Sequence, residues 1–332
     1  MVAVSFGLAC GGATPQAAAP LPDLSPNADS SPPPPASTAQ PALSAEVTKG
    51  VSALEANDLA GAKAHFQAAL QANASDADAH YYLGALSEKA GDTAAAETSY
   101  KAAVHARRGF TAAEVNLSAL YDDAQRFDEA LALTTPALAE HPKDASLHLN
   151  AAIAYGGKRD PAASVREFDA AIAITPSDPT FRLVYGHWLA VFGQRDASVT
   201  QLHAAVPLAL KNVGIVAAIG HELHITKAFD DCVAVFGQAI ALKDAAELWT
   251  ERAACKIGQK DDAGAVADLR AATAKDGTYA PAQYYLGNEL AKAGEYTPAI
   301  AAYQAFLKLE PNGPLAKGVA EKIRVAKQHG GH

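Results

Sequence analysis

Apolar and small residues recur at helical spacing through residues 280–313, in two runs separated by a break. The first run places Leu286 and Leu290 on one face, at the 3.6-residue period of an amphipathic helix. Gly294 then interrupts the pattern, and glycine favours the left-handed conformation that ends many helices. A second run carries Tyr303 on its apolar face and stops before a proline. The pattern predicts two short helices joined by a turn.

The same pattern repeats every 34 residues, once after 33, over residues 43–313. The repeating units begin at Leu43, Ala77, Thr111, Ala145, Pro179, Val213, Ala246 and Ala280. Positions 8, 20 and 27 of each unit hold small residues in nearly every case, as expected where two helices approach closely. Position 24 is large in seven units: Phe66, Tyr100, Phe168, Leu202, Phe236, Leu269 and Tyr303. We therefore predict eight helix–turn–helix units in which the large residue fills the gap beside the small ones.

This order of large, small and helix-breaking residues resembles the tetratricopeptide repeat. The resemblance implies an all-α superhelical solenoid, in which each unit contacts only its neighbours. It also implies a protein-binding role, with a partner segment lying in a concave groove. Pro136 and Pro207 fall inside second helices and should kink or shorten them.

Residues 314–328 are expected to form a capping helix, because apolar residues share one face there and charged residues lie elsewhere. Such a helix would cover the apolar flank of the last repeat and present its charged side to water. A short tail over residues 329–332 follows.

The net charge of −9 and the pI of about 5.6 argue against nucleic acid or a bare anionic membrane as the main partner. No apolar run reaches the ~18 residues that a membrane-spanning helix needs. The sequence contains no nucleophile–base set, no glycine-rich phosphate loop and no paired carboxylates in a pocket context. It therefore predicts neither an enzyme nor a bound cofactor.

The N-terminal residues suggest export. Residues 1–12 are apolar, and Leu8-Ala9-Cys10-Gly11 resembles the end of a bacterial lipoprotein signal, in which cleavage exposes a cysteine that is then acylated. The run lacks a preceding Lys or Arg, which we interpret as a truncated start. Residues 13–42 contain nine prolines and should form a disordered stalk. We expect an outer-membrane lipoprotein anchored at Cys10 and facing the periplasm; the alternative is a cytoplasmic adaptor without a lipid.

The family resemblance implies which residues line the groove. Positions 5 and 9 of each unit face the concave side in that family. Here they would place an apolar strip in the first half and imidazoles in the second. The predicted partner-binding residues are Tyr81, Val115, Leu149, Ile153, Leu183, His187, His221 and His224. The alternative is that neighbouring helices cover the apolar strip, which would make it part of the core.

Two further groups of residues bear on chemistry. His187, His221 and His224 fall in phase, so their imidazoles are a weak candidate for zinc, which takes three or four such ligands. The favoured interpretation is a polar groove without a metal, and the His221–His224 spacing excludes the HExxH metalloprotease motif. Cys232 and Cys255 are expected to be buried thiols, with a disulfide as the less favoured alternative.

The sequence thus predicts a protein–protein interaction scaffold or adaptor of the bacterial cell envelope. The rival function is a metal-binding or enzymatic protein that uses the histidine cluster. A cytosolic adaptor without a lipid anchor is the third interpretation.

Overall fold

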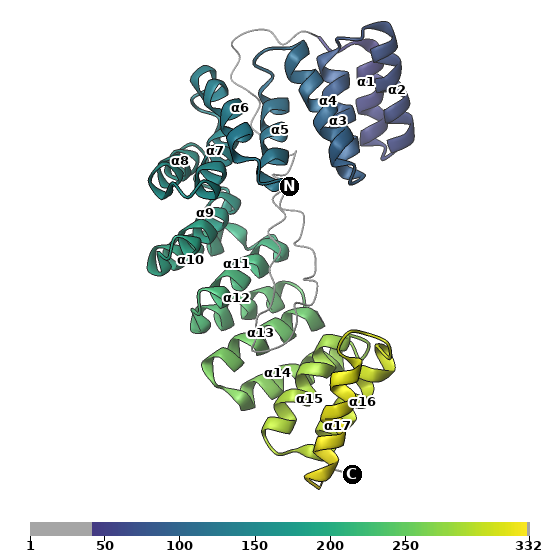
Figure 1. Ribbon diagram of the computed structural model, residues 1–332, viewed down its shortest axis with the longest axis vertical. Coiled ribbons are helices and arrows are strands. Elements are labelled where there is room, and N and C mark those ends of the chain that lie inside the picture. Colours follow the sequence, from purple (N-terminus) through teal and green to yellow (C-terminus); the bar gives the residue numbers. More distant parts are fainter. Residues whose placement is uncertain (1–41, 331–332) are drawn as a thin grey trace. The chain divides into compact units, whose positions relative to one another are not determined.

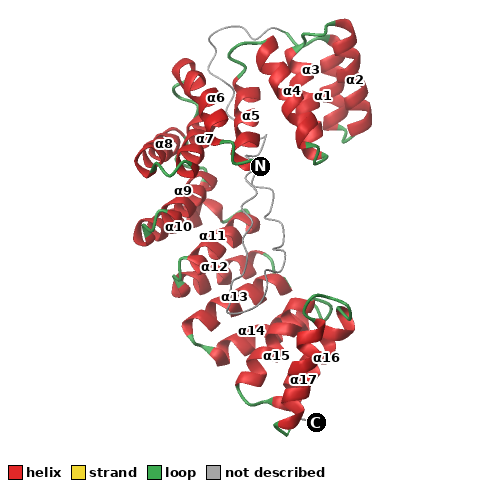
Figure 2. Cartoon of the chain, viewed as in Figure 1, coloured by secondary structure: helices red, strands yellow, loops and turns green. Residues whose placement is uncertain are grey.

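The computed structural model describes residues 42–330, in which eight consecutive pairs of helices precede one single helix (Figure 1). No strand occurs within these residues (Figure 2). The predicted all-α repeat fold, with eight helix–turn–helix units and a C-terminal helix, is confirmed. Cys10, the signal-like segment and almost all of the proline-rich segment lie outside the described residues.

The chain divides into two compact units after Ser177. The helices of the first unit are α1 Ala45–Glu55, α2 Leu59–Ala72, α3 Ala77–Lys89, α4 Thr93–Ala106, α5 Thr111–Asp123, α6 Phe127–Glu140, α7 Ala145–Gly157 and α8 Pro161–Ile174. Those of the second are α9 Pro179–Val191, α10 Arg195–Ala209, α11 Val213–Ile225, α12 Phe229–Leu242, α13 Ala246–Gln259, α14 Asp262–Lys275, α15 Ala280–Lys292, α16 Tyr296–Leu309 and α17 Ala316–Gln328. None of these helices combines the length and the apolar character that crossing a bilayer requires.

Side-chain caps and left-handed turns set the helix boundaries. At the turn before α4, Gly91 has a positive φ of 77°, and the carboxylate of Asp92 accepts a hydrogen bond from the backbone N–H of Ala95 at 3.0 Å. Pro136 and Pro207 lie inside α6 and α10, which have 14 and 15 residues and are as long as their counterparts. The expectation that these prolines could shorten their helices is therefore wrong.

The large residues at position 24 pack against the small residues at position 8 of the same unit. All seven are at most 2% exposed. Where position 8 is glycine, the contact is too close for any side chain: a Cβ at Gly84 would lie 2.6 Å from the ring of Tyr100, and one at Gly287 would lie 2.5 Å from the ring of Tyr303. The predicted interlock between small and large residues is thus central to the core of these seven helix pairs; the third pair has Thr134 at position 24 instead.

The last helix, α17, covers the apolar flank of the eighth pair. Val319 is fully buried among Leu286, Leu290 and Tyr303. On its polar side, the ammonium group of Lys322 donates a hydrogen bond to Asn288 Oδ1 at 2.6 Å. One face of α17 is therefore apolar and covered, as a capping helix requires.

We predict that Gly84→Ala lowers the free energy of unfolding by about 1–2 kcal/mol. Alanine improves helix propensity by up to ~1 kcal/mol, but overpacking a core costs ~1–3 kcal/mol. The ring of Tyr100 cannot yield freely, because its hydroxyl donates to Glu88 Oε2 at 2.7 Å and accepts from Asn116 Nδ2 at 3.0 Å. Chemical denaturation measures the change.

The matched control is Gly237→Ala in α12, where the nearest atom to an added Cβ is a guanidinium nitrogen of Arg252 at 3.7 Å. This substitution should be neutral or stabilising by up to ~1 kcal/mol. An equal change in the free energy of unfolding in the two variants would show that the close contact at Gly84 does not restrict the side chain at that position.

Candidate functional site

The predicted apolar strip is mostly core. Leu149, Ile153 and Leu183 are only 8%, 3% and 3% exposed. Tyr81 and Val115 are half-buried. The expectation of a continuous solvent-exposed strip is therefore wrong at three of its five positions, because neighbouring helices cover them. For these three residues the alternative interpretation, that they belong to the core, is the one the structure supports.

Tyr81 belongs to an aromatic cluster in the first unit. Its ring centroid lies 5.2 Å from that of Tyr82, 5.3 Å from that of Phe110 and 5.9 Å from that of Tyr100. Burial is the main cause that raises the pKa of the Tyr81 hydroxyl. The side chain is thus fixed by packing and presents only part of its ring to solvent.

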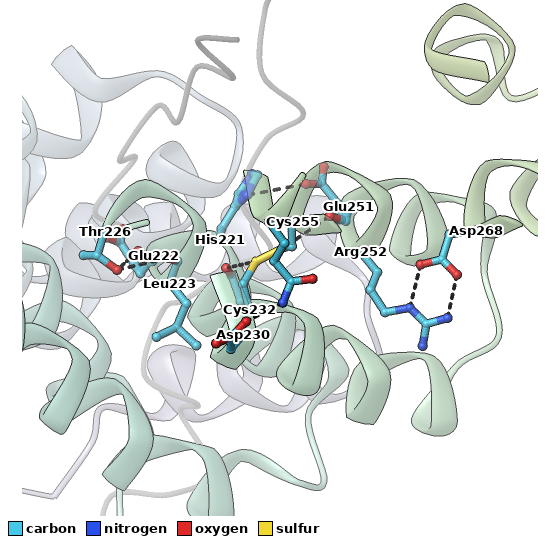
Figure 3. The surroundings of a disulfide bond; sticks show 12 residues. His221, Glu222, Leu223, Thr226, Asp230, Cys232, Glu251, Arg252, Cys255 and Asp268 are labelled. Carbon is cyan, nitrogen blue, oxygen red and sulfur yellow. Dashed lines mark hydrogen bonds and ion pairs between the residues drawn. A yellow bond between two sulfur atoms is a disulfide. The ribbon is translucent and has the colours of Figure 1, made fainter. Parts of the chain in front are cut away.

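In the second unit, imidazoles join the first helices of successive pairs. His187 Nδ1 on α9 lies 3.0 Å from Glu222 Oε1 on α11. His221 Nδ1 on α11 lies 3.6 Å from Glu251 Oε2 on α13 (Figure 3). Glu222 is 1% exposed, and its second oxygen is buried without a hydrogen-bond partner in the described residues. The predicted polar half of the repeat array thus takes the form of histidine–carboxylate contacts between α9, α11 and α13.

Burial sets the charge of these groups. It lowers the pKa of His221 to about 4, with a smaller contribution from His224, and it lowers the pKa of His224 as well. Burial also raises the pKa of Glu251 to about 7. Near neutral pH, His221 is therefore uncharged and Glu251 is partly protonated.

Two exposed aliphatic side chains lie one helical turn beyond the imidazoles. Val191 is 58% exposed and Ile225 is 47% exposed. Each follows a histidine by four residues, so Val191 shares a helix face with His187, and Ile225 with His221. We call these four residues the α9–α11 face. Sequence reasoning missed the two aliphatic residues, although both fall at position 13 of their repeats and the shared register was a usable signal.

The three candidate metal-binding histidines do not form a metal-binding group together within the described residues. The groups that come together within the described residues are His224, Cys232 and Cys255. One ligand atom from each lies within 4.8 Å of the other two. The imidazole of His224 is half-buried, and its buried Nδ1 has no hydrogen-bond partner in the described part of the chain.

Cys232 and Cys255 form a disulfide between α12 and α13 (Figure 3). Their Cα atoms are 5.9 Å apart, within the range that disulfides span. Both residues are fully buried. The favoured expectation of two free thiols is therefore wrong. Spacing along the sequence could not reveal the pairing, because it depends on how closely helices from consecutive repeats pack.

Comparison with known proteins identifies the repeat. A family model described as tetratricopeptide repeat matches residues 47–109 and 117–179. A search among curated proteins found no match. Among solved structures, yeast Tom70 has a TM-score of 0.54 at 15% identity, covering 86% of this chain and 63% of its own. The chain thus spans less than two thirds of the length of Tom70, and at this identity the likeness shows the fold alone.

Two bacterial structures are similar over shorter stretches. A thermophilic repeat protein of Thermus thermophilus has a TM-score of 0.47 at 21% identity, covering 54% of this chain and 97% of its own. PilF of Pseudomonas aeruginosa has a TM-score of 0.44 at 15% identity, covering 63% of this chain and 96% of its own.

The raised pKa of Glu251 predicts a pH-dependent stability. Because the unfolded carboxyl ionises near its ordinary value of 4.5 and the folded one near 7, stability falls as pH rises through this window. Glu251→Gln removes that penalty. The difference in the free energy of unfolding between the variant and the parent protein should shift in favour of the variant by about 1–3 kcal/mol as the pH rises from 5 to 8. Denaturant titrations at the two pH values measure this gain.

Glu247 is exposed on the same helix and provides the control. Glu247→Gln, which removes an exposed carboxylate from the same helix, should not reproduce the gain of Glu251→Gln. A Glu251→Gln variant whose advantage over the parent does not grow between pH 5 and pH 8 would refute the raised pKa of the partly buried Glu251 carboxyl.

Proposed function

Because this chain is a tetratricopeptide repeat protein, we propose that it binds a protein segment on the α9–α11 face. Proteins built from this repeat act as protein–protein interaction scaffolds, typically without enzymatic activity. The observation that carries the proposal is the exposure of Val191 and Ile225 on adjacent first helices of a unit in which most other large apolar residues are covered. The two residues occupy the same position of successive repeats, and an apolar surface that continues from repeat to repeat is typical of docking sites.

The neighbouring imidazoles define the chemistry of the partner. His187 and His221 each have a side chain that is 23% exposed, so each reaches solvent beside an aliphatic group. A segment that places apolar side chains over Val191 and Ile225 would bring its backbone or polar groups within reach of the two rings. An extended segment or an amphipathic helix fits such alternating contacts. In the first unit Tyr81 is a weaker candidate for docking, because its ring is fixed within the aromatic cluster.

Photo-crosslinking tests the face directly. A photoreactive residue at position 191, in the chain expressed in its native host, should capture a specific partner. With that partner purified, Val191→Asp combined with Ile225→Asp should weaken binding about thirtyfold or more, which corresponds to the ~2 kcal/mol of a binding hot spot. Thermal stability should change little, because both residues are exposed.

Leu242, at the end of α12, is 46% exposed and provides the control for both experiments. It is as apolar and as accessible as Ile225 but lies outside the α9–α11 face. Equal crosslinking from position 242, or full affinity in the double variant, would count against this face as the binding site.

We further propose that the protein works in the bacterial cell envelope, anchored by lipid at Cys10 and facing the periplasm. The Leu8-Ala9-Cys10-Gly11 junction and the proline-rich residues 13–42 support this location. The Cys232–Cys255 disulfide supports it independently, because structural disulfides persist in oxidising compartments such as the periplasm. A stalk between the lipid and the repeats would hold the binding face away from the membrane.

Metabolic labelling with a fatty-acid analogue tests the anchor. The gene, expressed with its natural upstream region, should give a labelled protein in the membrane fraction. Cys10→Ser should abolish the label, whereas Cys255→Ser, which removes a different cysteine, should retain it. Undiminished labelling of Cys10→Ser would refute the lipid anchor and favour the cytoplasmic alternative.

A further inference from the structure

We propose that His224, Cys232 and Cys255 form a zinc site in the reduced chain, which the disulfide replaces when the two cysteines are oxidised. The three residues come from α11, α12 and α13, and one ligand atom of each lies within 4.8 Å of the other two. Two thiolates and an imidazole form a ligand set that binds zinc in preference to harder cations. This site differs from the α9–α11 face in both residues and chemistry.

The backbone already has suitable dimensions for both states. A tetrahedral ion with Zn–S bonds of ~2.3 Å holds its ligand atoms about 3–4 Å apart. The Cα atoms of Cys232 and Cys255 are 5.9 Å apart, so rotation about the side-chain bonds can bring the two sulfurs to that separation. Zinc sites with three protein ligands complete their coordination with a water molecule in the fourth position.

The imidazole of His224 supplies the second observation. Its Nδ1 is buried and has no hydrogen-bond partner in the described residues. Leaving a buried polar atom unsatisfied destabilises the folded state, so such atoms in a folded protein call for an explanation. A ring that ligates a metal, or that turns to do so, explains why a histidine lies in this position beside two sulfurs.

The surroundings of the sulfurs also suit a reduced state. Cys232 Sγ lies 3.3 Å from the carbonyl oxygen of Gly220, and Cys255 Sγ lies 3.3 Å from that of Glu251. A neutral thiol at either position would donate a hydrogen bond to its carbonyl. Zinc would then displace the two thiol protons as the Zn–S bonds form.

Burial decides which state a given molecule keeps. Both cysteines are 0% exposed, so oxidants and reductants reach them only when the chain opens or before it folds. Oxidation transfers two electrons from the two cysteine sulfurs to a second disulfide, of a small molecule or a protein, which becomes two thiols. The two protons come from the cysteine thiols, or from solvent where zinc has already displaced them. The Cys232–Cys255 bond forms and any zinc leaves. A chain that folds in a reducing compartment would thus retain zinc, and one that folds in an oxidising compartment would be cross-linked.

The test uses the full chain carrying Cys10→Ser, so that only two cysteines remain. Protein made in a reducing cytoplasm and purified without oxygen should hold one zinc ion per chain, and the oxidised protein none. Competition with a chromophoric chelator measures affinity, and His224→Ala should weaken it about tenfold or more. Cobalt in place of zinc should give a thiolate charge-transfer band in the unmutated site.

His187→Ala is the matched control, because that imidazole lies on α9 and contacts Glu222. It should bind zinc as the parent does, and circular dichroism shows whether each variant is folded. A reduced parent chain that takes up no zinc, or cobalt-loaded protein without a thiolate band, would overturn the proposal. So would zinc binding that survives His224→Ala at full affinity or is lost in His187→Ala. The cobalt spectrum requires no ligand variant, so the test holds even if a variant fails to fold.

Discussion

Seven of the eight helix pairs share one feature, in which a large side chain of the second helix lies opposite a residue with little or no side chain on the first. At Gly84 and Gly287 the ring lies where a Cβ would otherwise be. This contact fixes how near the two helices approach, and the small residues at positions 20 and 27 follow from the same limit. Because seven of the eight units repeat this arrangement, core packing constrains the helix spacing along each compact unit, independently of the surface residues.

The surface of the second unit uses this regular spacing to bring ionisable groups into contact. His187 meets Glu222 and His221 meets Glu251 because the first helices of successive pairs lie side by side in register. His187 and His221 occupy position 9 of their repeats, which an apolar side chain fills in the first unit, where Ile153 is buried. The polar character of the second unit is therefore confined to a few positions per repeat, while its core follows the same rule as the rest.

The sequence predicts the fold well because the information lies within one repeat. Helical periodicity, the residues of the turn and the phase of the large residues all act over fewer than 34 residues. The candidate site is predicted less well because exposure depends on neighbours in other repeats. Leu149 and Val191 are both apolar residues on first helices, yet one is 8% exposed and the other 58%. The pairing of Cys232 with Cys255 escapes prediction for the same reason, since it is a distance between helices of different units.

The disulfide also changes how the array can come apart. Repeat arrays unravel one unit at a time, because each unit is held only by its neighbours. Cys232 and Cys255 belong to consecutive repeats and close a loop with a sequence separation of 23 residues, which lowers the entropy of the opened chain by an amount worth about 3 kcal/mol. Unravelling that begins at the C-terminal end would therefore meet a covalent link between α12 and α13. Under a pulling force, the chain between the two cysteines could not extend, because the disulfide holds its ends together. Unfolding these repeats by force would therefore lengthen the chain by less than the full length of the unfolded segment.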